Sequence, residues 1–182
     1  AAYRVVSPGV DGLSEPRGIL DCGNSGTSLR LISGVLAGLS MTATLDGDAS
    51  LRRRPVARII EPLRSMGAVL HGRRHDSLPP LTVVGRTPLR AIDVATSVPS
   101  AQVKSAILLA GLHADGVTSV TEPAQTRDHT ERALAAFGAT VERHGLVVPV
   151  AGGQRLVGRT LSIPGDFSSA AFWMVAAAAF PG

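Results

Sequence analysis

Three stretches of this chain repeat one arrangement, in which a short segment of small polar residues leads into a long apolar run. The polar segments include Ser25, Ser100 and Ser168, which lie 75 and 68 residues apart. This spacing is too long for a solenoid repeat and fits a βαβαββ unit copied within the chain. The repeat therefore predicts an α/β fold built from similar units.

The first two repeats predict the same order of elements: helix, strand, helix, strand, strand. Leu36-Ala37-Gly38-Leu39 matches Leu109-Ala110-Gly111-Leu112, and Met66-Gly67-Ala68 matches Phe137-Gly138-Ala139. Glycine after an apolar periodic run is a common helix end. We expect helices over 28–39, 54–66, 100–112 and 127–137, and strands over 3–6, 41–46, 68–71, 80–84, 91–96, 117–121, 139–144 and 146–150. The third repeat opens with an expected strand over 160–163, a turn at 164–166 and a helix beginning near 168.

The two helices of a repeat differ in polarity. The first is apolar on every side, as over 29–36, 106–112 and 172–179, whereas the second carries charges on one face. Helices that are apolar all round are buried on all sides. We therefore expect the apolar helices to gather in the interior, with the sheets outside.

Composition narrows the possible functions. The net charge is +4 and aromatic residues make up 3%, without the basic, aromatic-rich segments that bind nucleic acid. No apolar run has the length of a membrane span. Cys22 is the only cysteine, which excludes an internal disulfide and favours a cytoplasmic location. No zinc-like spacing occurs, so we expect no metal, and the absence of a Walker loop and of a GxGxxG motif leaves nucleotide binding without support.

Small polar residues begin the apolar helices, and an arginine stands at the expected start of each second helix. The polar groups are Asn24-Ser25-Gly26-Thr27 and Ser100-Ala101-Gln102, and the arginines are Arg54 and Arg127. Helix N-termini together with arginines suit phosphate and carboxylate ligands. Simple N-capping by the serines, and an ion pair within Arg127-Asp128-His129, are the alternatives. Because the pattern recurs, we favour an anion site at Arg54 and Arg127.

Five motifs, in order, resemble those of 5-enolpyruvylshikimate-3-phosphate (EPSP) synthase. The bacterial forms with SAQxKSA and TRDHTE motifs are most similar. The resemblance implies two domains of three βαβαββ units each, forming the inside-out α/β barrel of enolpyruvyl transferases. It also implies transfer of the enolpyruvyl group of phosphoenolpyruvate to shikimate 3-phosphate, with release of phosphate, no cofactor, and inhibition by glyphosate at the phosphoenolpyruvate site. The motifs are LDCGNSGTSLRL (20–31), GDASLRRRP (47–55), PSAQVKSAILLAGL (99–112), EPAQTRDHTE (122–131) and PGDFSSAAF (164–172).

The same resemblance assigns substrates to residues. It assigns phosphoenolpyruvate to Asn24, Gly26, Arg54 and Gln102. It assigns shikimate 3-phosphate to Ser100, Ala101, Gln102 and Arg127, with Ala101 where some members have a second serine. Thr27 and Arg30 match the motif with less defined roles.

The resemblance also divides the chain. It predicts that residues 1–155 form most of one domain, with repeat units at 20–85 and 90–151, and that 156–182 begin a second domain. The family's lysine–serine motif would precede Ala1, and its acid–base residues would lie in the second domain. We therefore expect no catalytic residue within this piece of a longer protein and no synthase activity from it alone. Phe172, Trp173, Val175 and Phe180 would leave an apolar patch that favours self-association.

Two other functions remain open from the sequence. The fragment could be a binding or structural module without turnover. The sister family, UDP-N-acetylglucosamine enolpyruvyl transferase, shares the fold but uses a cysteine ahead of the arginine–proline pair, where this chain has Ala49.

Overall fold

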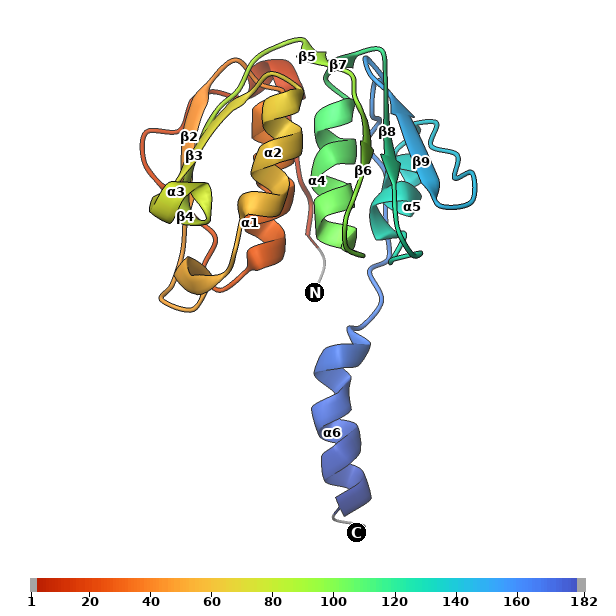
Figure 1. The fold of residues 1–182 in the computed structure, drawn as a ribbon. Helices are drawn as coiled ribbons and strands as arrows, with labels where there is room; N and C mark the ends of the chain where they lie inside the picture. Colours follow the sequence, from red (N-terminus) through yellow and green to blue (C-terminus); the bar gives the residue numbers. More distant parts are fainter. Residues whose placement is uncertain (1–2, 180–182) are drawn as a thin grey trace.

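Two apolar helices, α1 (Gly26–Ala37) and α4 (Ala101–Gly111), lie side by side at the centre of the fold (Figure 1). The structure is a computed structural model that describes residues 3–179, without the side chains of residues 167–169. Gly34 lets the helices approach closely, because a Cβ there would lie 2.2 Å from the carbonyl oxygen of Ala106. The expected packing of the first two apolar helices against each other is present.

A four-stranded sheet covers one side of this helical centre. Its order is β1-β2-β4-β3, with β1 parallel to β2 and the other pairs antiparallel. Alternate residues such as Leu45, Leu70 and Leu81 are fully buried, which fits strands with one face on the core. Helix α2 (Ala57–Ser65) packs between this sheet and α4. The strands are β1 (Leu20–Asp21), β2 (Thr42–Asp46), β3 (Val69–Gly72) and β4 (Leu78–Val84).

The second repeat forms a three-stranded sheet on the other side. Its order, β6-β8-β9, has a parallel pair followed by an antiparallel pair, as in β1-β2-β4. Gly67 and Gly138 end the second helix of each repeat with φ values of 105° and 93°. The elements are β6 (Asp93–Ala95), β8 (Val117–Thr121), α5 (His129–Ala136) and β9 (Val147–Ala151), with the short parallel pair β5 (Leu89–Arg90) and β7 (Ala114–Asp115) between the repeats. The described residues thus form a mixed α/β fold, and no closed barrel is present among them.

The strand expected over 139–144 is wrong, because this segment forms no sheet ladder. Gln154 holds Thr140 with both atoms of its amide, accepting from the Thr140 N–H at 2.6 Å and donating to the Thr140 carbonyl at 3.2 Å. Arg143 turns to the carboxylates of Glu122 and Glu131. Side chains thus replace the partner strand, and only His144 forms a β-bridge, with Val147.

The second helices begin later than predicted. Arg54 is extended, at φ −84° and ψ 131°, and ends the 3₁₀ turn η2 (Leu51–Arg53). The N–H of Val56 bonds to the carbonyl of Ser77, so the α-helix starts only at Ala57. Arg127 likewise lies just before α5. Both arginines therefore occupy loops ahead of helices.

Some shorter elements also differ from the prediction. The strands expected over 3–6 and 160–163 are absent, since both segments are exposed and pair with no strand in the part of the chain the structure describes. Two short turns were not predicted, η1 (Val10–Gly12) and α3 (Arg73–Asp76). Residues 74–76 of α3 have positive φ, so this turn is left-handed.

The third apolar helix, α6 (Phe167–Ala179), forms near the expected start but is not buried. It extends away from the rest of the structure (Figure 1). Phe172 and Trp173 are each 80% exposed. An apolar helix is buried only where other elements cover it, and none of the described elements does so. Phe180, predicted to belong to the same apolar patch, lies outside the described residues. No described helix combines the length and apolarity needed to cross a membrane.

Candidate active site

The start of α1 gathers an asparagine, an aspartate and an arginine. Ser25 caps the helix by accepting from the N–H of Ser28 at 3.0 Å. Asn24 accepts from Arg54 Nη2 at 2.6 Å and donates to Asp48 Oδ2 at 2.6 Å. The hydrogen bonds to Asp48, first from Asn24 and then from the Leu51 N–H, lower the pKa of this carboxyl. Asp48 is therefore ionised at neutral pH and fixes the Asn24 amide, which in turn orients Arg54.

Gly26 leaves room for two guanidinium groups. A Cβ at this position would lie 2.8 Å from Arg30 Nη1 and 3.3 Å from Arg54 Nη1. Burial, and then the charges of Arg54 and Arg58, lower the pKa of Arg30. The same positive potential that disfavours a further cation attracts an anion. The first turn of α1 thus has the charge of an anion site.

Gln102 connects the starts of the two central helices. Its Nε2 donates to Thr27 Oγ1 at 2.7 Å, and its Oε1 accepts from Arg30 Nη1 at 2.7 Å. Arg30 also donates to the carbonyl of Pro55 at 2.8 Å. The amide of Gln102 is therefore held in one orientation, and α1 and α4 share one polar surface at their N-terminal ends.

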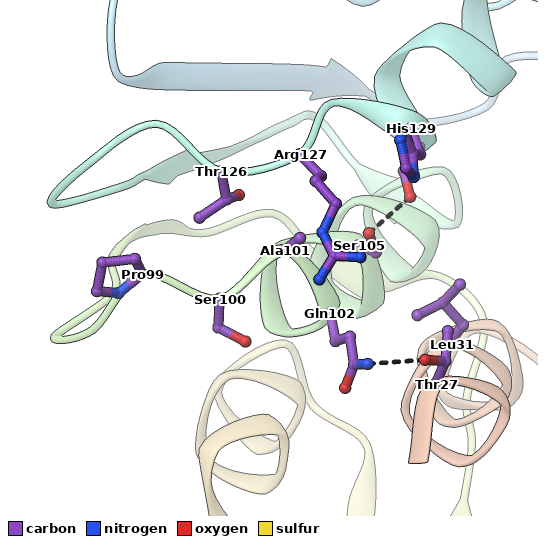
Figure 2. A pocket seen from close by; sticks show the side chains of 11 residues that line it. Thr27, Leu31, Pro99, Ser100, Ala101, Gln102, Ser105, Thr126, Arg127 and His129 are labelled. Carbon is purple, nitrogen blue, oxygen red and sulfur yellow. Dashed lines mark hydrogen bonds between the residues drawn. The ribbon is translucent and has the colours of Figure 1, made fainter. Parts of the chain in front are cut away.

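A cavity of about 450 Å³ lies beside this surface, between the start of α4 and the loop before α5 (Figure 2). Ser100, which caps α4 through a 3.4 Å contact with the Val103 N–H, lies at its edge. The exposed Arg127 side chain extends over the start of α4. Its guanidinium forms no ion pair or hydrogen bond with any residue that the structure describes, so the ion pair considered for Arg127 and Asp128 is absent. The lining residues are Thr27, Leu31, Pro99, Ser100, Ala101, Gln102, Ser105, Thr126, Arg127, His129 and Thr130.

The predicted site residues thus fall into two neighbouring groups. Asn24, Gly26, Arg30 and Arg54 surround the start of α1. Thr27, Ser100, Ala101, Gln102 and Arg127 line the cavity. Gln102, bonded to both Thr27 and Arg30, belongs to both groups.

Several polar residues of this region were not predicted. Asp48 supports Asn24, and Ser105 shares a 2.6 Å hydrogen bond with Thr130 beside the cavity. Lys104 was also missed, although a lysine within an otherwise apolar helix was a usable signal. In the part of the chain with described side chains, no group of three or more His, Cys, Asp or Glu residues is arranged to hold a metal.

The fold and site define a class: an α/β protein whose helix starts, with an arginine that has no partner among the described residues, are suited to small anionic ligands. Residues 2–182 match the family model described as "EPSP synthase (3-phosphoshikimate 1-carboxyvinyltransferase)". The chain belongs to the EPSP synthase family. This favours that family over the UDP-N-acetylglucosamine enolpyruvyl transferase alternative.

Curated relatives and solved structures agree with this assignment. The chain is 58% identical to the 3-phosphoshikimate 1-carboxyvinyltransferase of Pelotomaculum thermopropionicum over 98% of this chain and 41% of the relative. It is 56% identical to the 3-phosphoshikimate 1-carboxyvinyltransferase of Acidithiobacillus ferrooxidans, over 98% of this chain and 41% of that relative. The EPSP synthase structure from Acinetobacter baumannii superposes with a TM-score of 0.86 at 50% identity, covering 93% of this chain and 38% of that one. The chain therefore spans about 41% of the length of these curated relatives.

Proposed function

We propose that the protein to which this chain belongs transfers the enolpyruvyl group of phosphoenolpyruvate to the 5-hydroxyl of shikimate 3-phosphate. A bond forms between the hydroxyl oxygen and C2 of the enolpyruvyl group, and the bond from C2 to the phosphate oxygen breaks. Inorganic phosphate leaves, and in the overall balance it takes up the proton that the hydroxyl loses. The observation that carries the proposal is the Arg127 guanidinium, which lies at the cavity of Ser100 and Gln102 without a partner among the described residues. A free arginine beside a helix start is suited to a phosphate group.

The two groups of residues suggest one substrate each. Phosphoenolpyruvate would bind at the start of α1, against Asn24, Gly26 and Arg54, because Arg54 and Arg30 converge there. Shikimate 3-phosphate would place its phosphate on Ser100 and Arg127. Gln102 would lie between the two substrates. The site contributes binding and orientation, which supply much of the rate of a two-substrate transfer.

We also propose how the chain divides. Residues 20–85 and 90–151 would be two of three βαβαββ units of one domain, completed elsewhere to the inside-out α/β barrel of the family. Their shared strand order supports this. Residues 156–182 would begin a second domain, which agrees with α6 standing apart from the sheets (Figure 1).

The chain alone would lack synthase activity, since the resemblance puts the family's proton-transferring residues in the second domain. Phe172, Trp173 and Val175 are 80%, 80% and 68% exposed, which supports self-association through α6. A cytoplasmic location agrees with the single cysteine, Cys22.

Titration of the 182-residue chain with shikimate 3-phosphate tests the binding proposal. We expect saturable binding that is tighter than that of inorganic phosphate and that Arg127→Gln weakens. Arg132→Gln, on the nearby helix α5 but outside the cavity lining, serves as the matched control. Equal affinity for shikimate 3-phosphate in the wild type and Arg127→Gln would reject the assignment, and so would the absence of binding.

A further inference from the structure

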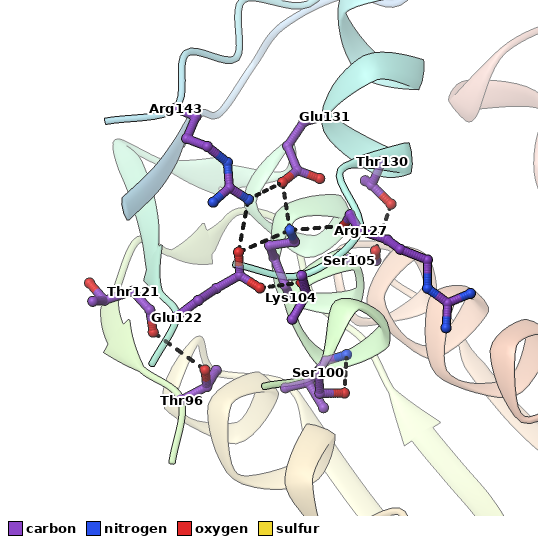
Figure 3. Close-up of polar contacts among 12 residues, drawn as sticks. Thr96, Ser100, Lys104, Ser105, Thr121, Glu122, Arg127, Thr130, Glu131 and Arg143 are labelled. Carbon is purple, nitrogen blue, oxygen red and sulfur yellow. Dashed lines mark hydrogen bonds and ion pairs between the residues drawn. The ribbon is translucent and has the colours of Figure 1, made fainter. Parts of the chain in front are cut away.

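Lys104, on α4, is a charged side chain buried in the core at 0% exposure. Its ammonium donates to Glu131 Oε1 at 2.7 Å, to Glu122 Oε2 at 3.1 Å and to the carbonyl oxygen of Arg127 at 3.0 Å (Figure 3). An ammonium group has three protons, so these three acceptors use all of them. The lysine is therefore fully paired and has a single preferred position.

Arg143 completes the charge balance of this cluster. Its Nη2 lies 2.8 Å from Glu122 Oε2 and 3.0 Å from Glu131 Oε1, so that two cations face two carboxylates. Burial alone would raise the pKa of Glu122, but hydrogen bonds from Thr126, Arg143 and Lys104 outweigh burial and lower that pKa. Both carboxylates share the same two cations, and we call these four side chains, Lys104, Glu122, Glu131 and Arg143, the buried ion cluster.

The buried ion cluster holds the loop that carries Arg127 at two consecutive residues. The hydroxyl of Thr126 donates to Glu122 Oε1, and the carbonyl of Arg127 accepts from Lys104. The Arg127 side chain extends in the other direction, away from the ammonium (Figure 3). The cluster therefore contacts Arg127 only through its main chain, from behind the cavity.

The first repeat shows that such a unit folds without this lysine. Leu29 stands four residues after the capping Ser25, as Lys104 stands four residues after Ser100, and each N–H bonds to the carbonyl of its capping serine. Leu29 is 1% exposed. A buried ion pair costs desolvation that an apolar side chain avoids. The packing requirement at this position is thus satisfied by leucine, and the charge needs another reason.

We propose that Lys104 is a positioning residue, which fixes the Arg127 carbonyl and so directs the Arg127 guanidinium toward an anion in the cavity. The identity of that anion as shikimate 3-phosphate rests on the proposed function. The fixed carbonyl restricts the loop, so that less conformational freedom is lost when the anion binds. Lys104 itself touches no ligand in this arrangement.

The test compares variants of the 182-residue chain that remove different parts of the buried ion cluster. Lys104→Met removes the donor to Arg127. Arg143→Met, the matched control, removes a cation from the same two carboxylates but leaves that donor in place. The double variant Lys104→Met/Glu131→Gln loses one positive and one negative charge, so it keeps the buried charge balanced even if Lys104→Met does not fold.

Two measurements are made on each folded variant: NMR order of the backbone amides of residues 125–128, and affinity for shikimate 3-phosphate. We expect the double variant to show a more mobile loop and to lose affinity by about tenfold or more, as misplacement of a positioning contact does. Arg143→Met should retain both properties, although it is also less stable.

The outcomes separate the two proposals. Unchanged loop order in the double variant would overturn the role of Lys104, and so would an equal loss in Arg143→Met. A wild-type chain that binds no shikimate 3-phosphate would refute the proposed ligand instead. In that case the NMR comparison alone decides whether Lys104 fixes the loop.

Discussion

Gln102 Nε2 on α4 donates to Thr27 Oγ1 on α1 at 2.7 Å, although the two residues are 75 positions apart in the sequence. Each lies in the first turns of the apolar helix of its own repeat. The hydrogen bond therefore joins the two repeats at the place where the proposed substrates would meet. Under the proposed function, the outer groups, at Arg54 and at Arg127, would act on separate ligands.

The two arginines should discriminate between the substrates. In the 182-residue chain, Arg127→Ala should chiefly weaken shikimate 3-phosphate and Arg54→Ala chiefly phosphoenolpyruvate, since each guanidinium lies at a different helix start. Loss of a charge-assisted contact of this kind costs on the order of 2–5 kcal/mol. Calorimetric titration of each variant with each ligand checks this. Equal losses for both ligands in both variants would contradict the assignment.

Gly26→Ala should alter selectivity at the proposed phosphoenolpyruvate site. The new methyl group would meet Arg30 Nη1 at 2.8 Å and Arg54 Nη1 at 3.3 Å, so the guanidinium groups must shift. Because these atoms are the ends of flexible side chains, the fold should survive. We expect glyphosate, the bulkier ligand, to lose more affinity than phosphoenolpyruvate. The ratio of the two dissociation constants measures this, and an unchanged ratio would remove Gly26 from that site.

Gly34→Ala should destabilise the fold itself. Its Cβ would be 2.2 Å from the backbone oxygen of Ala106, and a backbone atom cannot rotate away as a side chain does. Overpacking of this kind costs about 1–3 kcal/mol in the free energy of unfolding, which urea denaturation measures. Gly18→Ala is the matched control, because nothing lies within 4 Å of a Cβ there. Equal stability of the two variants would show that α1 and α4 separate more easily than their contact suggests.

The buried ion cluster should make the free energy of unfolding depend on pH in the acid range. The pKa of Glu122 is lower in the folded chain than its ordinary value of 4.5. The folded state therefore binds fewer protons, so this stabilisation is complete above pH 4.5 and is lost as the pH falls through the folded pKa. Glu122 faces Lys104, Arg143, Thr126 and Glu131.

Thermal unfolding of the wild type and Glu122→Gln between pH 3 and 7 tests this. The variant should be less stable at neutral pH and should lose less stability on acidification. Parallel pH profiles would mean that Glu122 does not titrate differently in the folded and unfolded states.

The central helices were predictable because their signal is strong and local. Apolar residues on all sides and small polar residues, including a serine, ahead of the apolar run marked α1 and α4, and the structure confirms both. The starts of α2 and α5 were less certain, since Val56 bonds to Ser77 and so delays the helix. The strand predicted over 139–144 was wrong. The segment has the residue alternation of a strand, but the side chain of Gln154, and not a neighbouring strand, bonds to the N–H and the carbonyl of Thr140.

The candidate site was predictable only in part. Residues at the helix starts could be recognised, because the repeat singles out Ser100 and Arg127. The residues that hold the site in place could not be found from the repeat, because they interact over long sequence separations. Lys104, for example, pairs with Glu122 and Glu131, which are 18 and 27 positions away.

The apolar composition of α6 predicted an interior position, which is wrong, because composition does not identify the covering elements. The expectation that Phe172, Trp173 and Val175 would form an uncovered patch agrees with their exposure.

The close contact between Gly34 and Ala106 has a mechanical consequence. Because backbone meets backbone there, no side-chain rotation can absorb a change in the distance between α1 and α4. The two helices therefore cannot move closer together, which sets a lower limit on the distance between the two helix starts. If each start binds one anion as proposed, this limit would exclude a ligand pair that requires a shorter separation. Selection by size would then be set deep in the core, far from any atom that a ligand touches.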